Sequence, residues 1–132
     1  MADYRKLKVW QRAHQLTAAV YKATMAFPQE ELYGLTNQIR RASVSIPANI
    51  AEGYGRGGDV EFARFLRIAL GSLNELEYLL LLSRDLGLLP QDLHGQLAIE
   101  VTEVRMMITG LLGRLAARSD KPAGSWQLKA GS

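Results

Sequence analysis

The chain has 132 residues, of which 48% are hydrophobic and 22% charged, with no cysteine and a formal net charge of +3 at pH 7. This length fits a single domain, and a chain this apolar buries enough surface to fold without cross-links. The absence of cysteine excludes disulfides, thiolate nucleophiles and Cys-ligated metals, and it fits a reducing compartment. A charge of +3 permits an anionic partner without requiring one.

Apolar residues recur every three or four positions in four segments, which is the spacing of an amphipathic helix. The first segment spans residues 9–27 and ends at Pro28, and the second spans residues 35–53 before a glycine-rich turn. The third spans residues 62–83, with Asp59 as its expected N-cap and with Gly87 and Pro90 after its end. The fourth spans residues 93–115.

Connections of a few residues force each helix to return beside the previous one. The sequence therefore predicts an all-α, up-down-up-down antiparallel four-helix bundle over residues 1–118. Residues 119–132 lose the helical spacing and are expected to form a flexible tail, within which Trp126 either docks on a neighbour or stays free. No segment resembles a secretory signal or the roughly 20 apolar residues that cross a bilayer, so we expect a cytoplasmic protein without membrane contact.

Pro47 lies in the middle of the second predicted helix. Because proline has no N–H, it leaves the Ser43 carbonyl without its helical partner, and we expect a Pro-kinked second helix. Ser43, Ser45 and Asn49 surround this point and are suited to local hydrogen bonding, although a ligand pocket at the kink is the alternative. Four polar residues are predicted to point inward or toward an interface and to need partners there: Gln38, Asn49, Glu52 and Glu75.

The second half of the third predicted helix is apolar on nearly every side. Residues 78–82 cannot all face one core, so a second buried face and a homo-oligomer are expected. The alternative is a wide core stripe that the loop or the tail completes. The residues assigned to the oligomer interface are Tyr78, Leu79, Leu81 and Leu82.

The sequence offers little for catalysis or metal binding. A di-iron bundle needs Glu-x-x-His, but Gln11 and Gln91 stand three residues before His14 and His94. No Ser–His–acid arrangement is visible, so no enzyme, metal or cofactor is predicted. Residues 53–58 match G-x-G-x-x-G but follow a helix instead of a strand, which excludes a dinucleotide fingerprint.

A phosphate contact at this glycine-rich turn remains open. The turn leads into a helix N-terminus, where Arg56 and Arg64 are placed to close around an anion. The alternative is that Asp59 caps the backbone donors itself.

Positive charge is concentrated in the first half of the chain. Residues 1–67 carry ten Lys or Arg and six Asp or Glu, whereas the rest carries six and seven. Repeated in each copy of the expected homo-oligomer, this half predicts a basic surface for RNA or DNA phosphates that consists of Lys8, Arg12, Arg40, Arg41, Arg56, Arg64 and Arg67. For Arg40 and Arg41 the alternative is an ion pair with Glu52, Glu61 or Glu75. Without exposed aromatics among these cations, base-specific recognition is not predicted.

Residues 38–53 read Q-I-R-R-A-S-V-S-I-P-A-N-I-A-E-G, and this stretch resembles the signature of the 23S rRNA intervening-sequence proteins. Segments around residues 9–11, 27–35, 61–66 and 71–77 resemble the same family in the same order, so that the resemblance covers about residues 3–118. It assigns a structural role to the signature residues Gln38, Ser45, Pro47, Asn49, Glu52, Gly53 and Glu75.

The resemblance implies an up-down bundle that assembles as a homopentameric ring. More distantly similar accessory proteins of diversity-generating retroelements partner a reverse transcriptase and nucleic acid, so either kind of partner is implied here. The expected function is a non-enzymatic binding or scaffold protein that contacts RNA or DNA. The alternative is a protein–protein assembly module with no nucleic-acid role.

Overall fold

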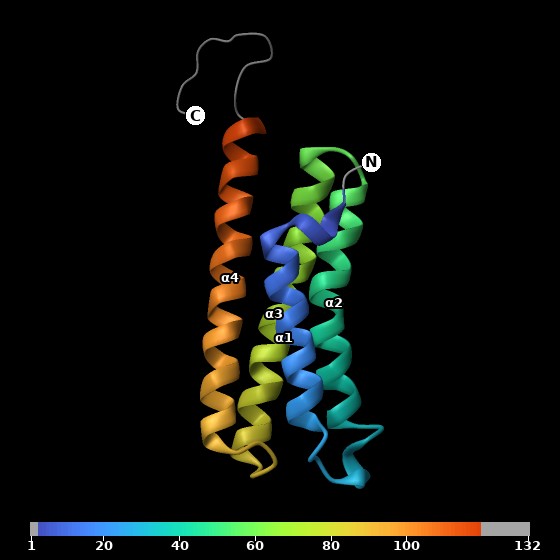
Figure 1. The fold of residues 1–132 in the computed structure, drawn as a ribbon, viewed down its shortest axis with the longest axis vertical. Helices are drawn as coiled ribbons and strands as arrows, with labels where there is room; N and C mark the ends of the chain where they lie inside the picture. Colours follow the sequence, from blue (N-terminus) through green and yellow to red (C-terminus); the bar gives the residue numbers. More distant parts are fainter. Residues whose placement is uncertain (1–2, 120–132) are drawn as a thin grey trace.

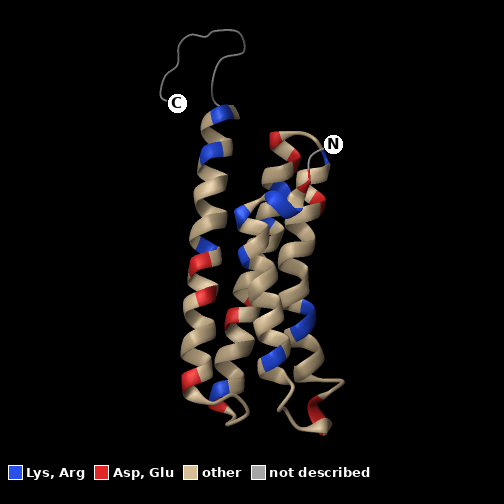
Figure 2. Ribbon diagram, in the orientation of Figure 1, with Lys and Arg blue, Asp and Glu red and all other residues tan. Residues whose placement is uncertain are grey.

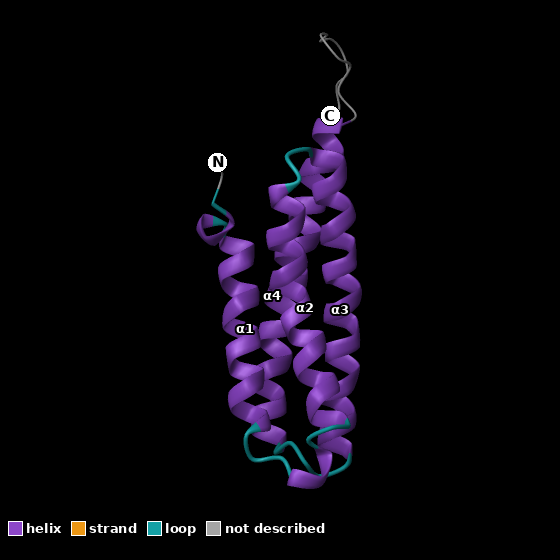
Figure 3. Ribbon diagram, turned by 90° about the vertical axis from the view of Figure 1, so that its right-hand side faces the viewer, coloured by secondary structure: helices purple, strands orange, loops and turns teal. Residues whose placement is uncertain are grey.

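The computed structural model describes residues 3–119, and all regular structure within them is helical (Figures 1 and 3). The elements are the 3-10 turns η1 (Tyr4–Lys6) and η2 (Gln29–Glu31) and the helices α1 (Lys8–Thr24), α2 (Leu35–Gly55), α3 (Asp59–Asp85) and α4 (Gln91–Ser119). Ser119, which the sequence assigned to the tail, is the last residue of α4. The rest of the predicted tail, with Trp126, lies outside the described residues.

Successive helices run in opposite directions and pack side by side (Figure 1). Contacts join α1 to α2, α2 to α3 and α3 to α4, and α4 returns to contact α1, which closes the bundle. The connections are short, so each helix packs against its neighbour in the chain. The predicted up-down-up-down four-helix bundle is confirmed.

The core consists of the residues that the apolar spacing placed on one side of each helix. Leu16, Ile46, Leu73 and Val104, one from each helix, have no exposed surface. Burial of a large apolar side chain contributes about 1.5–3 kcal/mol. The 3.6-residue repeat brings every third or fourth residue of each helix into this core.

Two helix ends differ from the sequence prediction. α1 ends at Thr24, three residues early, because the N–H groups of Met25 and Phe27 bond to carbonyls only three residues back. Phe27 is nevertheless buried, as predicted. The N-cap prediction for Asp59 is wrong: Gly58 occupies the cap position in extended conformation without a side-chain cap. Asp59 is the first residue of α3, where a negative charge favours the helix dipole.

The α3–α4 turn ends α3 as the sequence predicted. Gly87 has a φ of +78°, and its N–H bonds to the Arg84 carbonyl at 3.0 Å. The N–H of Leu88 bonds to the Ser83 carbonyl at 2.9 Å, so both donors satisfy carbonyls at the end of α3. Glycine is favoured at this left-handed position because it has no Cβ.

Candidate nucleic-acid interface

The seven predicted phosphate-binding residues lie on α1, α2 and α3 and in the α2–α3 turn. Lys and Arg as a whole are spread over the helices of the bundle (Figure 2). Arg56 and Arg64 meet over one ring, with their guanidinium carbons 5.0 and 4.6 Å from the centre of the Phe65 ring. Arg56 also donates to Glu52 at 2.7 Å, and Arg64 donates to Glu61 at 3.1 Å. A phosphate at this turn would compete with both carboxylates.

Arg12 and Arg40 connect neighbouring helices. Arg12 pairs with Glu103 and thereby joins α1 to α4. Arg40 Nε donates to Thr24 Oγ1 at 2.9 Å and its guanidinium carbon lies 4.7 Å from the centre of the Tyr21 ring, so it joins α2 to α1. Within residues 3–119 Arg40 makes no ion pair with the three acids that the sequence offered as partners, Glu52, Glu61 and Glu75.

Lys8, Arg41 and Arg67 are exposed and have no carboxylate within 4.0 Å in the described part of the chain. Lys8 shares a hollow of about 420 Å³ with Arg114, where the start of α1 approaches α4. Arg41 lines a second hollow with Glu75 between α2 and α3. These three cations are open to an external anion, but they belong to three different helices.

The net positive charge resides in the N-terminal segment. Residues 3–27 contain five Lys or Arg and a single acid, Asp3, and α1 itself contains three Lys or Arg and no acid. In contrast, α3 contains three Arg and five acids. The segment η1–α1 is therefore the most positive part of the described chain.

The same segment carries a row of aromatic side chains that the sequence prediction missed. The rings of Trp10 and His14 are stacked, with centres 4.9 Å apart and planes 7° apart. Tyr4 meets Trp10 edge to face at 5.1 Å, and Tyr21 lies further along α1. Positions 10, 14 and 21 are four and seven residues apart, which places their side chains on one face of a helix. The row was therefore predictable from the sequence.

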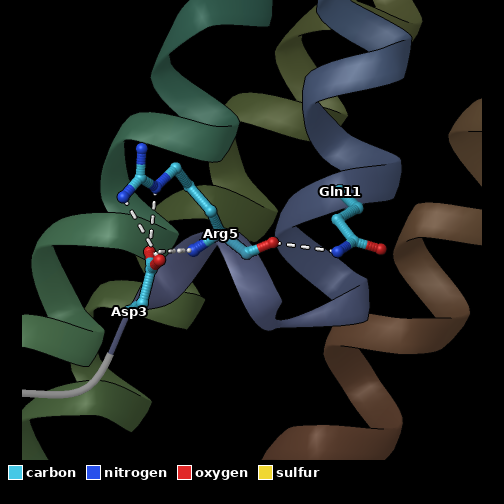
Figure 4. A network of polar contacts seen from close by, with 3 residues as sticks. All are labelled: Asp3, Arg5 and Gln11. Carbon is cyan, nitrogen blue, oxygen red and sulfur yellow. Dashed lines mark hydrogen bonds and ion pairs between the residues drawn. The ribbon is translucent and has the colours of Figure 1, made fainter.

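A small polar network fixes η1 on α1 (Figure 4). Asp3 accepts from the Arg5 backbone N–H at 3.0 Å and from Arg5 Nε at 2.9 Å, while Gln11 donates to the Arg5 carbonyl at 2.9 Å. Two hydrogen bonds from Arg5 lower the pKa of Asp3, and the bond from the side chain has a larger effect than the bond from the backbone N–H. The charge of Asp3 is therefore balanced by Arg5, and Asp3 does not offset the charge of the other cations in this segment.

At the α2–α3 turn, the hydrogen bonds from Arg64 lower the pKa of Glu61 below its ordinary value. The pKa of Arg64 is raised in return by the same carboxylate. Both side chains are exposed, so solvent screens this pair and it adds little to folding stability.

Pro47 of the signature stretch lies inside α2, and the helix continues past this residue to Gly55. The Ser43 carbonyl, freed because Pro47 lacks an N–H, accepts from Thr17 Oγ1 of α1 at 2.8 Å. Ser43 Oγ donates to the Arg40 carbonyl at 2.8 Å. The broken hydrogen bond is therefore replaced by the neighbouring helix, a donor that the local pattern around Pro47 did not reveal.

The other polar signature residues lie on the outer side of the α2–α3 contact. Ser45 Oγ is 2.7 Å from Ser72 Oγ, and Asn49 Nδ2 donates to Ser45 Oγ at 3.0 Å and to its carbonyl at 2.8 Å. Asn49 is half-buried, but Gln38, Glu52 and Glu75 are exposed. The prediction that these three point into the core is wrong, and their role at an interface stays a prediction.

Gly53 is the point of closest approach between α2 and α3. A Cβ on Gly53 would lie 2.5 Å from Phe65 Cβ and 3.3 Å from Phe62 Cδ1. Only glycine lets the two helices pack this closely, which explains the structural role assigned to this signature position.

The apolar residues 78–82 divide between two environments. Leu79 is 3% exposed and belongs to the core, so its assignment to an oligomer interface is wrong. Tyr78 is 58% exposed, Leu81 is 38% exposed and Leu82 is half-buried. With Glu77 and His94, Tyr78 and Leu81 line a hollow between α3 and α4.

Among residues 3–119 no group of three or more His, Asp or Glu side chains is arranged to hold a metal ion. No helix in the same part of the chain is long and apolar enough to span a bilayer.

A model of the 23S rRNA-intervening sequence proteins matches residues 5–110 of the chain. The chain belongs to this family. No functionally curated protein matches the chain. A solved structure from Bacteroides thetaiotaomicron, a protein of unknown function from the S23 ribosomal protein family, has 22% sequence identity and a TM-score of 0.73. The match covers 80% of this chain and 95% of that one, and it supports the bundle fold.

Neither comparison names an enzymatic activity for this member of the 23S rRNA-intervening sequence protein family. Its signature positions have structural roles within one chain: Gly53 allows close packing, Ser45 and Asn49 bond across the α2–α3 contact, and Pro47 leaves a carbonyl for α1.

Proposed function

We propose that this protein is a non-enzymatic, homo-oligomeric scaffold that contacts the phosphates of RNA or DNA through the η1–α1 segment. The observation that carries the proposal is the charge of residues 3–27, with five Lys or Arg and one acid that is already paired. This segment thus has a net charge of +4, which exceeds the net charge of +3 of the whole chain. An oligomer multiplies this charge on one particle, which strengthens its attraction for a polyanion.

A second copy of the chain is the proposed partner of the outward side of α3. Val60 is 73% exposed, Ile68 41% and Tyr78 58%, so large apolar side chains follow this helix from end to end. Covering such side chains is favourable, and a ring buries the same patch in every copy. The pentameric number comes from the family resemblance.

Salt-dependent binding tests the nucleic-acid part of the proposal. Each phosphate contact that is lost reduces the slope of log K against log salt by about 0.9 for duplex DNA. Replacement of Lys8 by Gln is expected to lower this slope, since Lys8 is exposed and has no carboxylate partner in the described chain. Arg105→Gln is the matched control, because Arg105 donates to Glu77 at 2.7 Å and its charge is already compensated. Absence of RNA and DNA binding at low salt would refute this part.

Native mass spectrometry tests the oligomer. Tyr78→Asp is expected to dissociate it while the helical circular dichroism of the chain is retained, since Tyr78 is exposed in the single chain. Ile99→Asp is the control on α4, where Ile99 is 62% exposed. A wild-type monomer at micromolar concentration would refute the oligomer.

A protein–protein assembly module without a nucleic-acid role is the second candidate. It is favoured by the pairing of Arg12, Arg56 and Arg64 with carboxylates of the same chain. Under this alternative the arginines stabilise the protein's own surfaces, and salt has no steep effect on any nucleic-acid binding.

A further inference from the structure

We infer that the α1 aromatic row, defined as Trp10, His14 and Tyr21 with Tyr4 at its end, is a stacking site for the bases of single-stranded nucleic acid. The inference rests on the proposed function and names its substrate class: an unpaired strand, whose bases are free to stack on side chains. Duplex nucleic acid keeps its bases stacked on each other and cannot use the row.

The first step is the arrangement of the rings. Trp10 and His14 are already stacked at 4.9 Å with nearly parallel planes, as successive bases are when they bind aromatic side chains. Tyr4 supports the edge of Trp10 at 5.1 Å. The stack is therefore formed before any ligand arrives, and little side-chain freedom is lost on binding.

The second step is access. Trp10 is half-buried, while His14 is exposed, so the stack ends in a ring that faces solvent. Ala18, one turn further along α1, is small and exposed, and it leaves room beside His14. Tyr21 follows at 41% exposure, about 16 Å from Trp10 along the helix axis at 1.5 Å per residue. The row thus offers exposed rings at two separate levels.

The third step is charge. No acid occurs in η1 or α1, and Asp3, the N-cap residue of η1, is paired with Arg5. Arg40 lies over the Tyr21 ring at 4.7 Å, so a cation stands beside the second exposed ring. A row of aromatic rings with a cation beside its second exposed ring, on a helix that contains no acid, matches a strand whose bases stack while its phosphates meet positive charge.

A helix face of this kind also fits a second copy of the chain, but that occupant is less suited to it. Burying α1 against the same surface of another copy would bring the cations of η1–α1 together without acids to pair them. Like charges at such an interface are unfavourable, whereas a polyanion neutralises them.

The test compares three labelled probes of equal length, about 16 nucleotides, which is at the upper end of single-strand site sizes. The first probe is a single-stranded oligoribonucleotide, the second is an abasic strand of the same length, and the third is the corresponding duplex. Each probe is titrated with the protein and followed by fluorescence anisotropy. We expect the single strand to bind about tenfold or more tightly than the abasic strand, because stacking contributes to one and not to the other.

Substitutions locate the effect. His14→Ala and Tyr21→Ala are each expected to weaken single-strand binding about tenfold while the salt slope stays unchanged, since no phosphate contact is removed. Tyr33→Ala is the matched control, because Tyr33 is an exposed tyrosine between η2 and α2, outside both the aromatic row and the outward side of α3. In a Trp126→Phe variant the indole of Trp10 is the single one in the chain, and the RNA is expected to quench its emission.

Each failure has its own signature. Equal affinity for the single and abasic strands, or unchanged binding by His14→Ala, overturns the stacking site and leaves the proposed phosphate contacts in place. Absence of binding by all three probes at low salt overturns both. A change of oligomeric mass in His14→Ala assigns the row to a subunit interface and also overturns the inference.

Discussion

Replacing Gly53 by alanine is expected to destabilise the protein by pushing α2 away from α3. The added Cβ would stand 2.5 Å from Phe65 Cβ and 3.2 Å from Phe65 Cγ, whereas carbon atoms in contact are normally about 3.5–4.0 Å apart. Because the closest atom is a Cβ, a rotation of the Phe65 ring cannot relieve the contact. The helices must separate by about 1 Å to restore normal spacing.

The magnitude follows from two opposing terms. Overpacking of a core costs about 1–3 kcal/mol, and a contact with an atom fixed to the backbone belongs at the upper end. Alanine in a helix interior is favoured over glycine by about 1 kcal/mol. The net loss of unfolding free energy is therefore expected to be about 2 kcal/mol, or a fall in Tm of about 5–10 °C for a chain of this size.

Gly113→Ala is the matched control for the helix-propensity term. Gly113 lies inside α4, it is exposed, and a Cβ there meets nothing within 4 Å. Alanine at this position is expected to stabilise the chain by about 1 kcal/mol. Both variants and the wild type are compared by urea unfolding at one chain concentration, because an oligomer's stability depends on it. A Gly53→Ala variant as stable as the wild type would refute the reasoning.

Three further predictions concern single contacts. Thr17→Val removes the donor to the Ser43 carbonyl, and urea unfolding is expected to show a loss of about 1–3 kcal/mol. Leu79→Ala is expected to cost about 2–5 kcal/mol in the same assay, because it leaves a cavity in the core. Arg64→Ala is expected to return the pKa of Glu61 upward to its ordinary value, as followed by NMR titration. In the wild type the lowered pKa makes this carboxylate stabilising at neutral pH, and the contribution disappears as pH falls through that pKa.

Controls separate these effects from general sensitivity. Thr109→Val is expected to change stability little, since its exposed hydroxyl bonds only to carbonyls of α4. Leu81→Ala is expected to cost less than Leu79→Ala in the chain itself, because Leu81 is 38% exposed. An unchanged Glu61 titration in Arg64→Ala would contradict the assigned cause of the pKa shift.

The helices and their buried faces were predictable because helical periodicity is a local property. Leu16 and Leu73 occupy positions that the three- and four-residue spacing selects, and both are fully buried. The helix ends were less predictable: Gly58 takes the cap position that Asp59 was expected to fill. Either residue type is a common cap, and the backbone of the turn decides between them.

The candidate interface was predictable only in part. The excess of positive charge in the first half of the chain is visible from the sequence, but counting charges does not show which cations are already paired. Arg56 and Arg64 were grouped with Lys8 as phosphate ligands, although carboxylates three or four residues away hold both arginines. The stack of Trp10 and His14 depends on side-chain rotation, which residue spacing alone does not fix.

The sequence by itself determined the number of helices, their core faces and the membership of a family whose signature occupies α2. Only the tertiary structure decided the partners of individual side chains. Thr17 supplies the hydrogen bond that Pro47 cannot, to a carbonyl 26 positions away, and Arg12 pairs with Glu103, 91 positions away. Periodicity arises from backbone geometry within one helix, whereas such pairs depend on how helices distant in sequence are placed against each other.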